Sequence, residues 1–210
     1  MKTAHSPLAD PMKILTRTEL GCVLKDLSRK AARSPSTRLN LIVFRLAACC
    51  GLRASEVAQL RLGDVHEHLP RPHLRIRSGA AKGNRPRVVP LWWDAGTYAD
   101  IAAWKEHRVE QGAKAEDPLV ASGRPGRETG QPLSRHTLRK RFRTACKVLG
   151  AKRLEQLTIH HGRHTFISHA LAGGRTLAEV RDAAGHANVS ITSSYLHVAV
   201  EEEGLGVLFT

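Results

Sequence analysis

The chain has 210 residues and carries 33 lysines and arginines against 19 acidic residues, a formal net charge of +14 at pH 7. This length predicts one domain that is large enough to bury a hydrophobic core. The charge imbalance favours a polyanionic partner, nucleic acid before membrane, over a basic protein that has no such partner. The sequence contains neither a signal peptide nor an apolar run of about 18 residues, so we expect a cytoplasmic protein with no membrane association.

The cysteines do not form a C-x-x-C motif, and two of them lie inside an apolar run. We therefore expect reduced core residues rather than disulfides. The four are Cys22, Cys49, Cys50 and Cys146.

The first 60 residues are expected to form a tail and three helices. Residues 1–15 show little apolar periodicity and are expected to form a disordered or strapping tail. A capping box over Thr16–Glu19 opens the first helix, and Gly51 ends the second. Residues 52–60 predict the third helix, with Arg53 in its first turn. Residues expected to be buried in the first two helices are Leu20, Val23, Leu24, Leu27, Leu39, Ile42, Val43, Leu46, Cys49 and Cys50.

Residues 64–91 predict a β-hairpin, because polar and apolar side chains alternate over 73–77 and an extended segment, 86–90, follows a glycine-rich loop. Lys82 lies in that loop, where a side chain can be held over a ligand. The alternative is an ordinary solvated lysine. Histidines 66, 68 and 73 lack the further ligands that a metal site needs, so no metal is expected.

Two more helices are expected before the C-terminal third, at 94–111 and 134–149, with an exposed loop at 116–132 between them. Tyr98, Ile101, Ala102 and Trp104 are expected to be buried in the first of these helices. The second has an apolar stripe of Leu138, Phe142, Ala145 and Leu149. Basic residues occupy its other faces, either as a solvated surface or, as the total charge favours, as a surface that follows DNA. They are Arg135, Arg139, Lys140, Arg143 and Lys147.

The stretch from Thr158 to His197 contains most of the candidate catalytic side chains. A helix is expected over 163–172, with Phe166, Ile167, Ala170 and Leu171 inward. A second, opened by Thr176 and Glu179, is expected to bury Leu177, Val180 and Ala184. Gly185 closes that helix, and a last short helix capped by Ser190 is expected to carry Tyr195.

Imidazoles, a guanidinium and a phenol are the groups that a metal-free site needs to move a phosphodiester. A guanidinium binds two phosphate oxygens at once, imidazoles relay protons, and a phenol can attack phosphorus. The alternative for each residue taken singly is structural: a surface pair between Arg53 and Glu56, or a core role for Tyr195.

These motifs, in this order, resemble the catalytic domain of tyrosine recombinases of the phage integrase family. The resemblance runs from about Thr16 to Val200, with 1–15 and 201–210 as tails. One difference is Gly162, where the family more often has an apolar residue. The matching positions are Arg53, Glu56, Lys82, His160, Arg163, His186 and Tyr195.

The resemblance implies a mainly helical α+β fold with a small antiparallel sheet at one edge. It implies that Tyr195 attacks a DNA phosphate to form a 3′-phosphotyrosine, while Arg53, Arg163 and His186 stabilise the transition state. His160 would accept the tyrosine proton, Lys82 would protonate the leaving oxygen, and Glu56 would support Arg53. Neither metal nor nucleotide cofactor is implied.

Partners and alternatives follow from the same resemblance. Double-stranded DNA is the expected partner, bound by a tetramer during strand exchange, and Leu205–Phe209 would dock on a neighbouring subunit or on its own core. The short N-terminal tail leaves no room for the clamp domain of two-domain relatives, so an accessory DNA-binding protein is a further expectation. A type IB topoisomerase-like activity and a catalytically idle DNA-binding regulator remain as alternatives.

Overall fold

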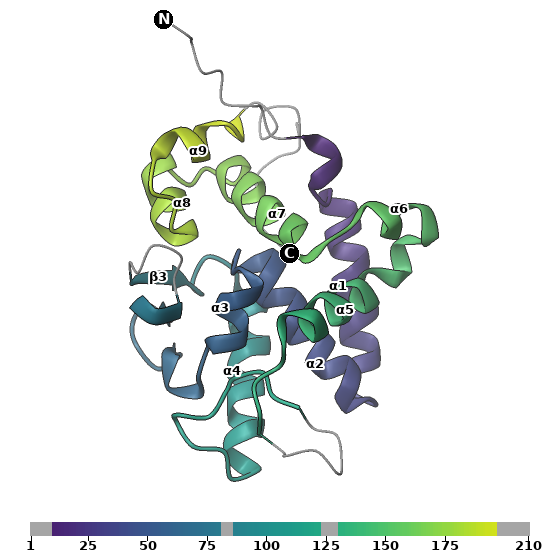
Figure 1. Ribbon diagram of the computed structural model, residues 1–210, viewed down its shortest axis with the longest axis vertical. Helices are drawn as coiled ribbons and strands as arrows, with labels where there is room; N and C mark the ends of the chain where they lie inside the picture. The colour runs from purple at the N-terminus through teal and green to yellow at the C-terminus, as the bar shows by residue number, and fades with distance from the viewer. Residues whose placement is uncertain (1–9, 81–85, 123–129, 197–210) are drawn as a thin grey trace, which may run out of the picture.

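The computed structural model describes residues 10–80, 86–122 and 130–196. It is mainly helical, with one small antiparallel sheet of three strands at the side of the helices (Figure 1), which confirms the predicted fold class. The elements in chain order are η1 Pro11–Lys13, α1 Arg17–Ala31, α2 Pro35–Phe44, the π-helical turn η2 Arg45–Cys49, α3 Ala54–Gln59, η3 Leu62–Asp64, β1 Val65–His66, β2 His73–Ile76, η4 Ser78–Ala80, β3 Arg87–Pro90, α4 Ala95–Glu110, α5 Arg135–Ala145, η5 Cys146–Leu149, α6 Ala151–Gln156, α7 Ile159–Ala172, α8 Leu177–Ala184 and α9 Val189–Ser193.

Local capping starts α1 and α8 where the sequence predicts it. Thr16 and Glu19 form the reciprocal capping box of α1, and Thr176 and Glu179 form that of α8. The predicted apolar face of α1 is buried, as is the apolar run through α2 and η2. Within the described ranges, no helix combines the length and apolarity needed to cross a membrane.

The sheet has the strand order β1-β2-β3, with antiparallel neighbours throughout. Ile76 pairs with Arg87 and Leu74 pairs with Val89. Because side chains alternate along a strand, Arg87 and Val89 share the inward face of β3, while Val88 between them is exposed.

Helix α7 runs through the middle of the fold, between α8 and α1 (Figure 1), and packs closely against η2. The crossing depends on Gly162: a Cβ at this position would lie 3.0 Å from the carbonyl carbon of Ala47 and 3.1 Å from its Cβ. Gly51, with a φ of +65°, ends the η2 segment directly against the ring of Phe166. Both glycines therefore let η2 approach the helix that carries His160 and Arg163.

The N-terminal segment is a strap over its described part. The backbone N–H of Leu15 donates to Thr165 Oγ1, and its carbonyl lies 2.8 Å from His169 Nε2, so the strap is fixed to α7. Ile14 belongs to the same apolar cluster as Phe166 and Tyr195.

Several predicted boundaries and burials are wrong. Helix α7 begins four residues before the predicted start, because Nδ1 of His161 accepts from the Thr158 N–H and caps it. Asn188, not Ser190, caps α9, and that helix ends at Ser193, so Tyr195 lies in the turn beyond it.

Other errors come from tertiary packing. The predicted exposed loop contains a buried run, Leu119–Ala121, whose first N–H donates to the carbonyl of Leu60. Cys22 is exposed because it lies off the apolar face of α1, whereas the other three cysteines are buried. Tyr98, Ala102, Leu149, Leu171 and Leu177 are only half-buried.

Candidate active site

Glu56 is the carboxylate at the base of the candidate site. Its side chain is fully buried and accepts from the Arg53 N–H at 2.8 Å and from Arg53 Nη1 at 3.0 Å. Nη1 and Nη2 of Arg87 each donate to it at 2.8 Å. Burial raises the pKa of Glu56, but the hydrogen bonds and charges of Arg87 and Arg53 outweigh it and hold the pKa below its ordinary value. One carboxylate is thus shared by two guanidinium groups.

Arg53 is placed to meet an anion, because it caps the N-terminus of α3 and its side chain is 21% exposed. The predicted surface pair with Glu56 does form, yet its acidic member is buried. The pair therefore orients Arg53 as well as partly neutralising it.

Arg163 is a buried cation. Within the described residues, its side chain donates hydrogen bonds to two carbonyl oxygens. Nη1 donates to Gly51 at 2.8 Å and Nη2 donates to Ala184. Burial, and then the charge of Arg53, lower the pKa of Arg163 to about 9, although the Glu56 charge acts in the opposite direction. A buried guanidinium among other cations favours an incoming anion.

His186 follows Gly185, the left-handed residue that ends α8, and its Nδ1 lies 2.9 Å from Thr192 Oγ1. Burial, and then the charges of Arg163 and Arg53, lower the pKa of His186 to about 3. The imidazole is therefore neutral at pH 7. When Thr192 donates this hydrogen bond, Nε2 carries the ring proton and can donate it to a phosphate oxygen.

His160 lies in the first turn of α7 and is exposed. Burial of part of the ring, and then the charges of Arg139, Arg163 and Arg53, lower the pKa of His160. The structure thus brings His160 together with both predicted catalytic arginines.

Tyr195 is buried, and its hydroxyl shares a hydrogen bond with Nδ1 of His164 rather than with His160. Burial raises the pKa of Tyr195, and the Arg163 charge lowers it in part. Burial, and then the charges of His161 and Arg163, lower the pKa of His164 to about 4. Both partners are therefore neutral at pH 7.

Two residues of the site were missed in the sequence. His164 is next to Arg163 and four positions after His160. A cluster of histidines at the start of a helix was therefore the pattern in the sequence that could have identified it. Arg87 is two positions before the apolar Val89 and so lies on the same face of β3, which marks it as an inward-facing arginine. Lys82, by contrast, lies outside the described residues.

The five predicted DNA-contacting residues, four on α5 and Lys147 on η5, are all exposed, but they do not share one face. Arg139 lies close enough to His160 for its charge to lower that pKa. Arg143 donates to the carbonyl of Leu157 at 3.2 Å, just before α7. Lys140 lines a separate groove of about 1470 Å³ between α2, α4 and α5.

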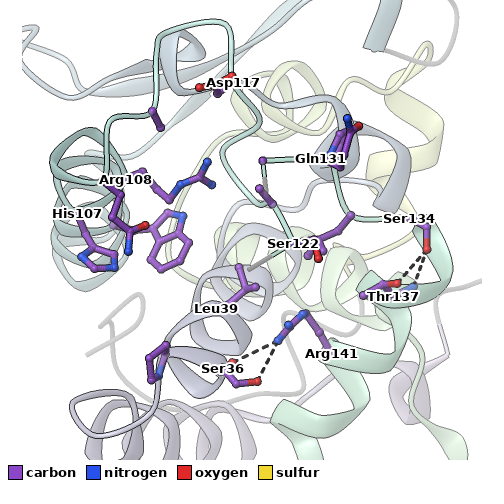
Figure 2. Close-up of a pocket in the computed structure, with 18 of the residues that line it drawn as sticks. Ser36, Leu39, His107, Arg108, Asp117, Ser122, Gln131, Ser134, Thr137 and Arg141 are labelled. Carbon is purple, nitrogen blue, oxygen red and sulfur yellow. Dashed lines mark hydrogen bonds between the residues drawn. The ribbon is translucent and has the colours of Figure 1, made fainter. Parts of the chain in front are cut away.

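Figure 2 shows this groove, in which Arg141 of α5 reaches Ser36 of α2 and Arg108 points inward from α4. Arg108 donates to the carbonyls of Pro118 and Leu119. Of the predicted catalytic residues that the structure describes, none lines the groove. The candidate chemistry therefore lies elsewhere, where α3, α7 and the end of α8 meet.

The family model described as the phage integrase family matches residues 16–202, and the chain belongs to this family. It is 31% identical over 162 residues to tyrosine recombinase XerC of Corynebacterium efficiens, covering 77% of this chain and 47% of that protein. It is 30% identical over 208 residues to tyrosine recombinase XerD of Proteus mirabilis, covering 91% of this chain and 61% of that protein. The chain thus spans about half to three-fifths of the length of these relatives.

Solved structures show the same fold. The crystal structure of XerA recombinase matches with a TM-score of 0.70 at 20% identity, over 96% of this chain and 64% of that one. XerH site-specific recombinase, bound to palindromic difH substrate in a post-cleavage complex, matches with a TM-score of 0.69 at 20% identity, over 91% and 51%.

Proposed function

We propose that this chain supplies the catalytic part of a site-specific DNA recombinase that breaks and rejoins strands through a 3′-phosphotyrosine on Tyr195. The observation that carries the proposal is that the charges of Arg53 and Arg163 both act on His186, while Glu56 is the carboxylate whose charge acts on these two arginines. With Arg87, the site holds three arginines, and the single negative charge of Glu56 can balance only one of them. Such a site is suited to the dianionic oxygens of a phosphodiester transition state.

In the proposed first step, the Tyr195 hydroxyl oxygen attacks phosphorus and the bond from phosphorus to the 5′ oxygen breaks. The tyrosine proton passes to His160, and the departing oxygen takes a proton from Lys82, which leaves a 5′-hydroxyl. When Tyr195 is the donor in its hydrogen bond with His164, transfer of its proton to His160 requires that bond to break. Religation is the reverse reaction with a 5′-hydroxyl, so no external energy source is needed.

The family membership supports this proposal, and so do relatives named tyrosine recombinases. Duplex DNA is the proposed partner, because the chain is basic and the similar XerH was captured on its DNA substrate. Strand exchange by a tetramer on DNA, with or without an accessory DNA-binding protein, belongs to the same proposal.

The test is to incubate the protein with labelled DNA from the region flanking its own gene and to map covalent 3′ ends on denaturing gels. A discrete set of protein-linked 3′ ends is expected. Recombinant joints, rather than relaxed circles alone, separate a recombinase from a topoisomerase-like enzyme. Binding without any covalent adduct would instead support the idle DNA-binding regulator.

A further inference from the structure

Arg87 lies in the candidate site but has no role in the proposed transfer steps. Its side chain is 7% exposed, and three of its nitrogens have hydrogen bonds to protein oxygens. Nη1 and Nη2 donate to the two carboxylate oxygens of Glu56 at 2.8 Å, and Nε donates to the carbonyl of Ala183 at 2.9 Å. This is the paired, in-plane contact that a guanidinium makes with a carboxylate and a lysine does not.

On one side, Arg87 shares the carboxylate of Glu56 with Arg53 and so determines how far Glu56 neutralises Arg53. Glu56 is fully buried, so it needs a cation next to it. Arg87 provides two hydrogen bonds from the same guanidinium, whereas the side chain of Arg53 provides one. Arg53 is held in place by this arrangement but is not fully neutralised, and it is the more exposed of the two arginines.

On the other side, Arg87 supports the end of α8. Its Nε holds the carbonyl of Ala183, and a Cβ on Gly185 would lie 2.8 Å from Arg87 Cδ. Gly185 has a φ of +66°, which positions the next residue, His186. The same side chain therefore contacts both the carboxylate that orients Arg53 and the turn that presents His186.

We propose that Arg87 is a positioning residue of the strand-cleavage reaction: it neutralises Glu56 so that the charge of Arg53 remains available to the scissile phosphate, and it fixes the turn that carries His186. Without Arg87, Arg53 is the remaining arginine on a buried carboxylate and is drawn away from the phosphate. The inference rests on the proposed function. It assigns Arg87 an effect on cleavage through Arg53 and His186, with no contact to DNA.

The test compares Arg87→Gln, Arg87→Lys and Arg53→Ala with the wild type on a duplex cleaved at the mapped position. A matched control is Arg108→Gln, which removes another buried arginine from α4, away from the site. Two substrates are used: the ordinary phosphodiester, and one with a methylphosphonate at the scissile position, in which a methyl group replaces a charged non-bridging oxygen. Cleavage rates, DNA affinity and thermal unfolding are measured for each protein.

On the phosphodiester, Arg87→Gln should lower the cleavage rate by roughly 100-fold, because Arg53 is then withdrawn as a transition-state donor, with DNA affinity almost unchanged. Arg87→Lys should fall between it and the wild type, and Arg108→Gln should cleave normally. On the methylphosphonate, the deficits of Arg87→Gln and Arg53→Ala should both shrink, because less charge has to be stabilised.

Equal deficits of Arg87→Gln on the two substrates would reduce Arg87 to a purely structural role and overturn the proposal, as would wild-type cleavage of the phosphodiester by Arg87→Gln. If Arg87→Gln does not fold, the same comparison is decided by Arg87→Lys. If the wild type itself forms no covalent adduct, the proposed function fails, and that result is distinct from failure of the role of Arg87.

Discussion

The hydroxyl of Tyr195 shares a hydrogen bond with Nδ1 of His164, and the two rings stack with their centroids 5.6 Å apart. Tyr195 is 6% exposed, so water does not readily replace this bond when it is lost. In the described structure the proposed nucleophile is thus held by a histidine that has no part in the proposed proton transfer.

A double-mutant cycle tests this coupling. Tyr195→Phe and His164→Phe should each lower the free energy of unfolding by about 1–2 kcal/mol, because the first removes the partner of the half-buried His164 ring and the second that of the buried Tyr195 hydroxyl. The double variant should lose less than the sum of the two, as measured by denaturant unfolding. His161→Phe is the matched control, since His161 Nδ1 bonds to the Thr158 N–H instead. Additivity of Tyr195→Phe with His164→Phe to within about 0.5 kcal/mol would mean that the bond does not form in solution.

Stability should fall as the pH is lowered from neutral. The pKa of His164 is about 4 and that of His186 about 3 in the folded chain, against an ordinary value of 6.5. Between pH 6.5 and these lower values, the unfolded chain binds protons that the folded chain does not, so acid favours unfolding. The melting temperature, followed from about pH 7.5 to about pH 5, should therefore decrease.

The double variant His164→Gln/His186→Gln should show a shallower pH dependence than the wild type. The dependence should not vanish, because His66, His160 and His161 also have lowered pKa values. His68→Gln serves as the control, since the side chain of His68 is 92% exposed. Identical slopes for the double variant and the wild type would contradict the half-buried, neutral state of these two imidazoles.

DNA affinity should fall steeply with salt, because lysine and arginine contacts to phosphates release counterions. Among the predicted residues on α5, Arg139 has a charge that lowers the pKa of His160 at the candidate site. Arg139→Ala should reduce the magnitude of the slope of log K against log salt by about 1, measured by fluorescence anisotropy on a duplex. Lys140→Ala removes the same charge one residue away, on the side of the groove, and should change the slope less. A flat salt dependence of the wild type would contradict a phosphate-binding surface.

Gly162→Ala should destabilise the fold by about 1–3 kcal/mol, the usual effect of overpacking. The new methyl group would press on the backbone of Ala47, which cannot move aside as a flexible side chain can. Gly21→Ala in α1 is the matched control: its Cβ meets nothing within 4 Å, and the helix should gain about 0.5–1 kcal/mol. Denaturant unfolding measures both variants, and equal stabilities for the two would show that the crossing of α7 and η2 is looser than described.

Features that depend on neighbours in the sequence were predictable. The capping boxes of α1 and α8 need only residues three positions apart, and the pair between Arg53 and Glu56 has the same spacing. The apolar faces of α1 and α5 follow from the helical period. For this reason the fold class and most elements could be predicted from local patterns together with the family resemblance.

Features that depend on tertiary contacts could not be obtained in this way. Arg87 is 31 positions from Glu56, and the carbonyl partners of Arg163 lie on two other segments, at Gly51 and Ala184. Leu119–Ala121 is buried because it pairs with the segment around Leu60, although its surroundings are rich in proline and glycine. Neither spacing nor composition contains this information.

The proposed chemistry depends above all on the identity of the nucleophile. The wild-type protein, trapped on its mapped DNA site, is digested with trypsin and nuclease and examined by mass spectrometry for a nucleotide-modified peptide. The chain has 2 tyrosines, Tyr98 and Tyr195, and cleavage after Arg181 separates the second from the first.

We expect a nucleotide joined through its 3′ phosphate to Tyr195 in the peptide that begins at Asp182, and no covalent adduct from Tyr195→Phe while DNA affinity is retained. An adduct on any other residue, or an undiminished adduct from Tyr195→Phe, would contradict the assignment of Tyr195 as the nucleophile.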